Sequence, residues 1–387
     1  MSACELLVVG GGPAAHSAAR GYRAAGGTGP VIVLAGERRF PYERPSLSKE
    51  LLRGEAGPDA LPLEPLDEMT TVRHGEALAL HPDARRVAVA GDDDITYTSV
   101  VLATGAAPVR PPLPGVDLPD VHVLRTVADA LALRAATAAP GTRVLVLGSG
   151  FIGCEAAASL RARGCAVTLV SQEPAPQDAR LGPEVAARLA GWLDAAGVDA
   201  RYDAELTAIE AGAPLRATLG DGTTVAADVV LLASGVRPLS ELARAAGLAL
   251  AGGGEVAADA ALRTSAPGVL ACGDCCRATH GLAGRPLHVE HWGDALAQGE
   301  VAGWTAAGKQ ASWDTVPGFW STIGTNTLKY AAWGDGFDTT NLVDHGDGAF
   351  TAWYGDAAGA CVGVLTHDYD PDYETGMKLI AQGAPRP

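Results

Sequence analysis

Short apolar runs that end in glycine-rich turns mark two similar units along the chain. In the second unit, an apolar run at 143–147 meets a turn with three glycines. A helix-forming run at 154–161 and another apolar run at 166–170 follow. Apolar runs of this length bounded by turns are typical of buried strands. The pattern therefore predicts a strand, a turn, a helix and a strand, and the G-x-G-x-x-G spacing of the turn predicts that this unit binds a dinucleotide.

The residues of this turn have separate tasks. Gly148 makes the tight turn, Gly150 leaves room for a pyrophosphate beside the backbone, and Gly153 lets the helix pack on the strand. The start of the helix adds free N–H groups and a partial positive charge. We expect the phosphates of the dinucleotide to be held by Gly148, Gly150, Phe151, Ile152 and Gly153.

The chain opens with the other unit. An apolar run at 5–9 leads into a G-x-G-x-x-A turn, which a helical pattern at 16–25 and an apolar run at 30–35 follow. Glu37 lies just past that second strand, where a carboxylate can accept a hydrogen bond from a ribose hydroxyl. The turn residues expected to bind are Gly10, Gly12, Pro13, Ala14 and Ala15. Two such units predict two dinucleotides, and the natural pair is a flavin and a nicotinamide, because hydride passes between them.

Net charge, the length of the apolar runs and the cysteine content exclude several classes of protein. A net charge of -16 argues against a general nucleic-acid binder, and no apolar run reaches membrane-spanning length. The first strand begins near residue 5, which leaves no room for a signal peptide, and seven scattered cysteines suit reduced thiols. We expect a cytoplasmic monomer or homodimer of two or three domains, with neither a nucleic acid nor a membrane as partner.

The segment after Glu37 resembles a known family. Its run Tyr-Glu-Arg-Pro-Ser-Leu-Ser-Lys at 42–49 is similar to the R-P-x-L-S-K signature of the FAD-dependent ferredoxin and rubredoxin reductases, which include putidaredoxin reductase and have apoptosis-inducing factor as a relative. The resemblance implies that Pro45 and Lys49 lie beside the flavin ring and Arg44 near the pyrophosphate. A fixed ammonium there would stabilise the negative charge of the reduced flavin. It also implies that Glu155 pairs with Lys49, and we expect these two residues to be catalytic.

Further motifs of the family follow in the same order. The sequence Ala-Thr-Gly at 103–105 resembles the segment that returns against FAD, and Arg110 after it is expected to contact the flavin nucleotide. Gly235 lies in a second crossing of this kind. Gly273 and Asp274 end an apolar strand, and the aspartate is expected to bind the ribityl chain. The remaining residues that the resemblance places at the cofactors are Ala103, Thr104, Gly105, Glu290, His291, Trp292 and Trp320.

The resemblance implies an α/β fold of the glutathione-reductase architecture. We expect two Rossmann-like domains and a small α+β domain: FAD at 1–115 and 242–315, NAD(P)H at 116–241, and the third domain at 316–387. The implied activity is hydride transfer from NAD(P)H to FAD, followed by electron delivery to an iron–sulfur carrier such as a ferredoxin. Two alternatives stay open: a flavoenzyme that acts directly on a small molecule in a biosynthetic pathway, and a non-catalytic flavoprotein with an interaction role.

The sequence does not decide between NADH and NADPH. The position that usually carries the acidic ribose acceptor is Ser171, and the next basic residue along the chain is Arg180. Cys272 and Cys275 have C-x-x-C spacing, but they overlap the flavin motif, and residues 38–60 contain no cysteine. We expect no redox disulfide and no metal site, so the electrons leave the flavin directly.

The C-terminal domain is acidic. No lysine or arginine occurs between Tyr330 and Met377, whereas nine carboxylates lie in that span. An acidic face would repel an acidic carrier. This predicts either a neutral or basic carrier or a small-molecule acceptor, in contrast to a strongly acidic ferredoxin.

Overall fold

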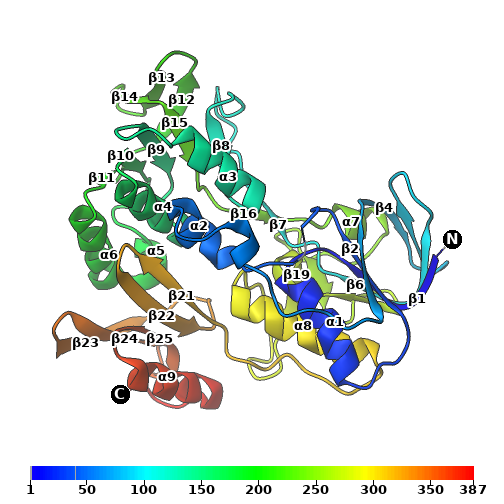
Figure 1. Cartoon of the computed structure of the whole chain (residues 1–387). Coiled ribbons are helices and arrows are strands. Elements are labelled where there is room, and N and C mark those ends of the chain that lie inside the picture. The colour runs from blue at the N-terminus through cyan, green and yellow to red at the C-terminus, as the bar shows by residue number, and fades with distance from the viewer. Residues whose placement is uncertain (1, 40) are drawn as a thin grey trace.

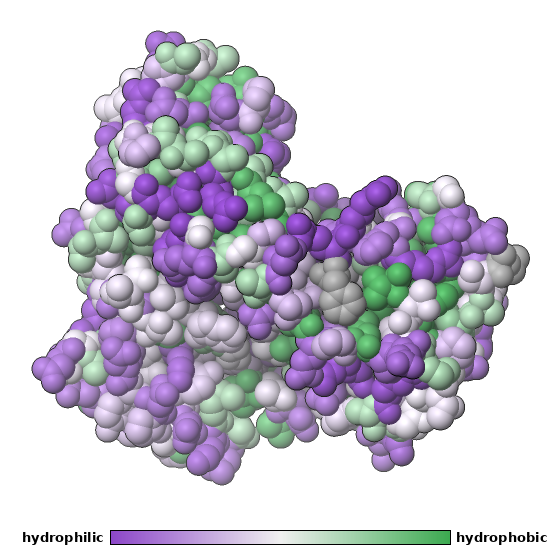
Figure 2. All heavy atoms as spheres, viewed as in Figure 1, coloured by the Kyte–Doolittle hydropathy of each residue, from purple (hydrophilic) through white to green (hydrophobic). Residues whose placement is uncertain are grey.

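The computed structural model describes residues 2–39 and 41–387. Figure 1 shows the N-terminal part of the chain and α8 at the right, the middle of the chain at the upper left, and the C-terminal sheet at the lower left. In Figure 2 the outline is notched between the upper-left lobe and the larger lobe at the right. No helix in the described ranges is long and apolar enough to cross a membrane.

The first large sheet is mainly parallel. Its parallel strands run in the order β3-β2-β1-β6-β18, and an antiparallel pair, β4 and β5, joins it through β6. The bounds are β1 Ser2–Val9, β2 Val31–Ala35, β3 Thr70–His74, β4 Ala77–His81, β5 Arg86–Val89, β6 Ile95–Leu102 and β18 Val269–Ala271. This order places the carboxyl ends of β1, β6 and β18 side by side, at the edge of the sheet where folds of this class bind ligands.

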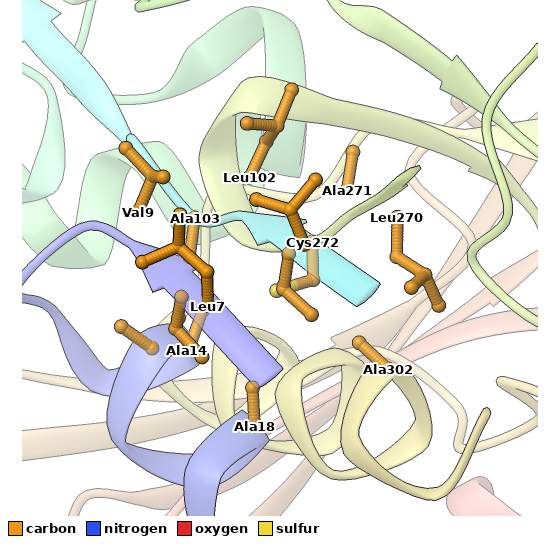
Figure 3. Close-up of a cluster of buried hydrophobic side chains, with 14 of the residues drawn as sticks. Leu7, Val9, Ala14, Ala18, Leu102, Ala103, Leu270, Ala271, Cys272 and Ala302 are labelled. Atoms are coloured by element: carbon orange, nitrogen blue, oxygen red, sulfur yellow. The ribbon is translucent and has the colours of Figure 1, made fainter. Parts of the chain in front are cut away.

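Two long helices cover one face of this sheet. Helix α1 (Pro13–Ala24) and helix α8 (Trp292–Ala306) pack on each other through small residues. Figure 3 shows Ala14 and Ala18 of α1 and Ala302 of α8 beside Leu7 and Leu102 of the sheet. All five side chains are buried, which anchors the turn before α1. The other elements near this sheet are α2 Glu50–Arg53, α7 Glu241–Ala245, β17 Val256–Ala258, β19 Cys276–Thr279, β20 Pro286–Leu287 and 3₁₀ turns at Arg44–Ser48, Pro58–Ala60 and Gly273–Cys275.

The second large sheet is fully parallel, in the order β11-β10-β9-β15-β8. A small antiparallel sheet of β12, β13 and β14 lies beside it. The bounds are β8 Val121–Val123, α3 Val127–Ala136, β9 Arg143–Leu147, α4 Phe151–Ala162, β10 Ala166–Val170, α5 Asp178–Leu181, α6 Pro183–Ala195, β11 Asp199–Arg201, β12 Leu206–Glu210, β13 Leu215–Leu219, β14 Thr224–Ala227 and β15 Val229–Leu232.

The two parallel sheets are joined by two crossing segments that pair with each other. Strand β7 (Ala106–Pro108) is antiparallel to β16 (Val236–Pro238). A glycine precedes each of them, Gly105 with φ 71° and Gly235 with φ 95°, where glycine adopts the left-handed region at little cost. The second dinucleotide unit is therefore inserted into the first by a paired, two-stranded connection.

The C-terminal part forms an antiparallel sheet in the order β21-β22-β25-β24-β23, with one helix packed on it. Its elements are β21 Gly318–Ile323, β22 Asn326–Ala332, β23 Thr339–Gly346, β24 Ala349–Gly355, β25 Cys361–His367 and α9 Asp370–Gln382. Strand β21 contacts α4 and α8, so the C-terminal part packs against a helix of each dinucleotide unit.

The expected fold class is confirmed, with differences at the boundaries. Helices α1 and α4 begin directly after Gly12 and Gly150, several residues before the expected starts, because Pro13 and Phe151 already continue the helix from the turn. Strand β21 was not predicted from its sequence, since it begins at a glycine and has no clear alternation. It is held by six residue pairs with β22.

Candidate active site

The two glycine turns have the same internal geometry. The first glycine of each is closed against backbone: a Cβ on Gly10 would lie 2.0 Å from the Ala103 carbonyl oxygen, and one on Gly148 would lie 2.4 Å from that of Ala233. The second glycine of each is open, because a Cβ on Gly12 would meet only the Arg44 side chain, at 3.9 Å.

The second turn completes the parallel. A Cβ on Gly150 would meet only the Gln177 side chain, at 3.7 Å, and one on Gly153 would lie 2.1 Å from the Gly148 carbonyl oxygen. A pyrophosphate on a helix N-terminus requires open space beside the second glycine of the turn. It also requires close packing at the first and third positions. The residues present therefore fit two dinucleotides.

Polar side chains cluster beside the first turn. Glu37 accepts from the Tyr42 hydroxyl at 2.6 Å, and its other oxygen is 2.5 Å from the Arg44 guanidinium. Arg44 also donates to the carbonyl of Arg125 at 2.8 Å. Burial foremost raises the pKa of Tyr42 to about 12, so this hydroxyl stays protonated and can donate to Glu37. The structure thus brings together Glu37, Arg44 and Gly12, three residues predicted separately.

Arg125 is a functional candidate that sequence reasoning missed. Its guanidinium donates to Asp274 at 2.6 Å and lies 3.6 Å from where a Cβ on Gly105 would be. It connects two motifs that are distant in the sequence, Ala-Thr-Gly at 103–105 and Gly-Asp at 273–274. The only sequence signal was a single arginine before the capping box of α3 at Thr126. Thr104 donates to the Leu239 carbonyl at 2.5 Å, which ties this segment to the second crossing.

The start of α8 carries the predicted segment Glu290-His291-Trp292. His288 contacts the carbonyl oxygen of Asp274 at 2.9 Å and lies 3.8 Å from the Glu290 carboxylate. Partial burial is the main cause that raises the pKa of Glu290, and the nearby Asp274 carboxylate adds to it, while His288, Arg125 and Arg180 act in the opposite direction. Glu290 therefore lies among charged residues from several distant segments of the chain.

The predicted contact between Lys49 and Glu155 is confirmed. The Lys49 ammonium donates to Glu155 Oε2 at 2.9 Å, and Lys49 and Glu155 are 6% and 5% exposed. Three more donors reach the same carboxylate: the hydroxyls of Ser48 at 2.5 Å and Ser321 at 2.7 Å, and the Thr322 backbone N–H at 3.2 Å. A buried carboxylate needs such partners, and each oxygen here accepts two hydrogen bonds.

The Glu155 carboxylate binds residues from all three parts of the chain: the N-terminal part, the second dinucleotide unit and the C-terminal sheet. Lys49 and Ser48 come from the N-terminal part, Glu155 from the helix of the second dinucleotide turn, and Ser321 and Thr322 from β21. Aromatic rings converge through the same elements: the ring centroid of Phe319 is 4.8 Å from that of Phe151 and 4.4 Å from that of His291. We call Lys49, Glu155, Ser48, Ser321 and Thr322 the junction.

Other predicted residues lie further apart. Trp320 is on the opposite face of β21 from Ser321 and is 46% exposed. Arg110 is exposed and donates to the Val116 carbonyl, so its guanidinium is committed to its own loop. Ser171 is buried with its hydroxyl 2.7 Å from that of Ser149. The individual binding roles of Pro45, Ile152, Trp292, Trp320, Arg110 and Gly235 stay predictions.

The cysteines are unpaired and lie in the interior. All seven are free and buried, and burial is the main cause that raises the pKa of Cys272 and Cys275 above the usual range of a thiol. Neutral buried thiols are poor nucleophiles. Within residues 2–39 and 41–387 no group of His, Cys, Asp or Glu could hold a metal ion.

Comparisons with known proteins agree with this geometry. The model of the pyridine nucleotide-disulphide oxidoreductase family matches residues 4–311. The ferredoxin--NAD(+) reductase component of the anthranilate 1,2-dioxygenase system of Burkholderia cepacia is 34% identical, over 99% of this chain and 96% of its own length.

Two solved structures have the same fold. The ferredoxin reductase for the CYP199A2 system of Rhodopseudomonas palustris superposes with a TM-score of 0.93 at 30% identity, covering 99% of this chain and 95% of that one. Putidaredoxin reductase in its covalent complex with putidaredoxin gives a TM-score of 0.92 at 26% identity, over 98% and 94%. The chain therefore belongs to the pyridine nucleotide-disulphide oxidoreductase family and is an oxidoreductase that uses FAD and a pyridine nucleotide.

Proposed function

We propose that this chain is a reductase that takes hydride from NADH and delivers electrons, through FAD, to a small iron–sulfur carrier protein of the ferredoxin type. The carrier is proposed because two relatives that match nearly the whole chain are named as ferredoxin reductases, and putidaredoxin reductase, which has the same fold, was solved in covalent complex with putidaredoxin. NADH gives two electrons and the carriers accept them one at a time, so each NADH reduces two carriers and releases a proton.

The chain's residues divide this work by domain. We propose that residues 1–115 and 242–315 hold FAD through Gly12, Arg44 and Asp274, and that residues 116–241 hold the nicotinamide dinucleotide through Gly148 and Gly150. FAD supplies the step from two-electron to one-electron chemistry when bound. Residues 316–387 would border the site and offer the surface on which the carrier docks.

The observation that carries the proposal is the junction. A buried ammonium held by a carboxylate with four hydrogen-bond donors is fixed in orientation, and it lies where the two dinucleotide units meet. Lys49 would stabilise negative charge that develops on the reduced cofactor, and Glu155 would keep Lys49 in place. Such preorganised charge is effective because the pair is buried and already oriented before the reaction.

The seven unbridged thiols favour a reducing compartment, and we propose the cytoplasm as the location.

The function is tested by anaerobic mixing of the FAD-loaded protein with NADH, followed by mixing with an oxidised ferredoxin. We expect rapid bleaching of the flavin absorbance, and then its recovery as the ferredoxin is reduced. A flavin that NADH bleaches but ferredoxins do not reoxidise would favour a small-molecule acceptor instead.

A further inference from the structure

The second dinucleotide unit has an unusual end to its second strand. In folds of this kind an acidic residue at that point accepts hydrogen bonds from the adenosine ribose. Strand β10 ends at Val170, and the residue that follows is Ser171, whose hydroxyl is 2.7 Å from that of Ser149 and accepts from the Glu173 backbone N–H at 3.2 Å. Ser171 is therefore engaged in fixing the loop that follows it.

Glu173, two residues further on, is the nearest carboxylate along the chain. Its backbone carbonyl accepts from the Asp203 N–H at 3.2 Å, and Ser171 is linked to the same loop by the Ala204 N–H at 2.9 Å. Burial foremost, then the carboxylates of Glu155 and Glu173, raise the pKa of the Cys154 thiol, which lies in the first turns of α4. The Glu173 carboxylate thus lies close to the helix that begins at the glycine turn.

The carboxylate of Glu173 lacks a partner. Its Oε2 atom is buried and accepts no hydrogen bond from any described residue. The hydroxyl of Tyr202, on the adjoining loop after β11, is also buried without a partner in the described part of the chain. Buried polar atoms are nearly always hydrogen-bonded, and an unpaired one is costly. A ribose diol would supply two O–H donors for the carboxylate and oxygen acceptors for the tyrosine.

We propose that Glu173, in place of the usual residue at position 171, accepts the hydroxyls of the adenosine ribose and makes the chain selective for NADH over NADPH. This rests on the proposed function, in which a nicotinamide dinucleotide binds the second unit. The selectivity follows from charge: the extra 2′-phosphate of NADPH would meet a carboxylate in a partly buried site, where repulsion is weakly screened.

The nearest basic side chains do not compensate. Arg201 at the end of β11 is 3.3 Å from the Asp199 carboxylate, and its charge is largely balanced there. The charge of Arg180 opposes the burial that raises the pKa of Glu290 and of Tyr330, which lie before α8 and in β22. The Arg201 backbone carbonyl accepts from the Ser171 N–H at 3.0 Å, so Arg201 adjoins the loop, but its guanidinium pairs with Asp199 and not with Glu173.

The test is calorimetric binding of ADP-ribose and of 2′-phospho-ADP-ribose to the FAD-loaded protein, which needs no turnover. We compare wild type, Glu173→Gln and the control Glu205→Gln, which removes an exposed carboxylate from the same edge of the sheet. For Glu173→Gln we expect ADP-ribose to bind about 10- to 100-fold more weakly, and the preference over the 2′-phosphate to fall by at least that factor. The control should bind like wild type, and equal melting temperatures check that each variant is folded.

Each other outcome has a definite meaning. Wild type that binds ADP-ribose well, with Glu173→Gln unchanged, overturns the role of Glu173 but leaves the proposed function standing. Tighter binding of 2′-phospho-ADP-ribose by wild type also overturns the inference. If wild type binds neither compound, the proposed function itself fails.

Discussion

At the scale of single residues, the acceptor capacity of Glu155 explains why β21 lies where it does. Ser321 is 1% exposed, and its hydroxyl donates to Glu155 Oε1 at 2.7 Å. A hydrogen bond to a buried charge is stronger than one between neutral groups. One small side chain therefore couples the C-terminal sheet to the residue that orients Lys49.

Replacing Ser321 by alanine should lower the free energy of unfolding by about 2 kcal/mol and slow flavin reduction by NADH. The matched control is Thr322→Ala. The Thr322 hydroxyl contacts that of Thr327, whereas its backbone N–H, which donates to Glu155, remains in the variant. Urea unfolding and stopped-flow absorbance would measure both effects. Equal losses of unfolding free energy and of flavin-reduction rate in the two variants would show that the bond from the Ser321 hydroxyl to Glu155 has no specific role.

A buried histidine should make stability depend on pH. His280 is fully buried, and its ring meets that of Trp313 in an edge-to-face contact. Burial is the main cause that lowers the pKa of His280. Below about pH 6.5 the unfolded chain takes up a proton that the folded state resists. This contribution is complete above that pH and is lost as the pH falls towards the lower folded value.

We expect the free energy of unfolding of His280→Gln to fall less steeply with acid than that of wild type, by up to about 1.4 kcal/mol per pH unit. The variant keeps some slope from other histidines such as His16, whose pKa is also lowered mainly by burial. Chemical unfolding at several pH values checks the difference. Parallel pH curves would contradict this explanation.

At the scale of elements, the contact between α1 and α8 fixes the first dinucleotide turn. A Cβ on Gly299 of α8 would lie 2.4 Å from the Ala14 carbonyl oxygen and 2.9 Å from the Ser17 side chain. Because α1 begins at the turn, any displacement of α1 also displaces Gly12.

Gly299→Ala should therefore destabilise the protein by about 1–3 kcal/mol and weaken FAD retention. Gly191→Ala is the control, since a Cβ at that exposed position of α6 would meet nothing within 4 Å, and alanine favours helix by about 0.5–1 kcal/mol. Thermal unfolding and the flavin content of the purified protein measure the two variants. Full flavin content in Gly299→Ala would show that α1 tolerates the displacement.

The sequence predicted the elements that have a local pattern. Both glycine turns, their flanking strands and the acidic hairpin between β5 and β6 follow from spacing alone. What it did not predict depends on distant partners. Strand β21 is defined by β22 and by Glu155, and the role of Arg125 arises from Asp274, which lies 149 residues away. Glu173 was passed over because only the folded loop shows that Ser171 is engaged elsewhere.

At the scale of the whole molecule, three cations on and near the C-terminal sheet are paired with carboxylates. The Lys329 ammonium is 2.6 Å from the Asp370 carboxylate, Arg277 pairs with Glu255, and Arg285 pairs with Asp335. Figure 2 shows hydrophilic residues spread over the lower-left lobe, where this sheet lies. These three cations are thus each balanced by a carboxylate, and the exposed Lys309 and Lys378 are the remaining lysines of this region.

We therefore expect a strongly acidic ferredoxin to be reduced slowly at low salt, and faster as salt screens the repulsion. A neutral or basic carrier should be reduced faster and with little gain from salt. Initial rates over a range of ionic strength distinguish the two. Fast reduction of an acidic ferredoxin that falls with added salt would instead indicate a basic docking patch.

The central claim is that the buried Lys49–Glu155 pair, where the three sheets meet, is part of the hydride-transfer site. The most direct measurement is the rate of flavin reduction in a single anaerobic mixing of NADH with FAD-loaded Lys49→Met, compared with wild type and with Lys329→Met. We predict a loss of about 10²-fold for Lys49→Met with FAD retained, because a fixed charge is removed from a buried site, and no loss for Lys329→Met, because Lys329 is partly exposed and pairs with Asp370. Unchanged hydride transfer in Lys49→Met would contradict the account.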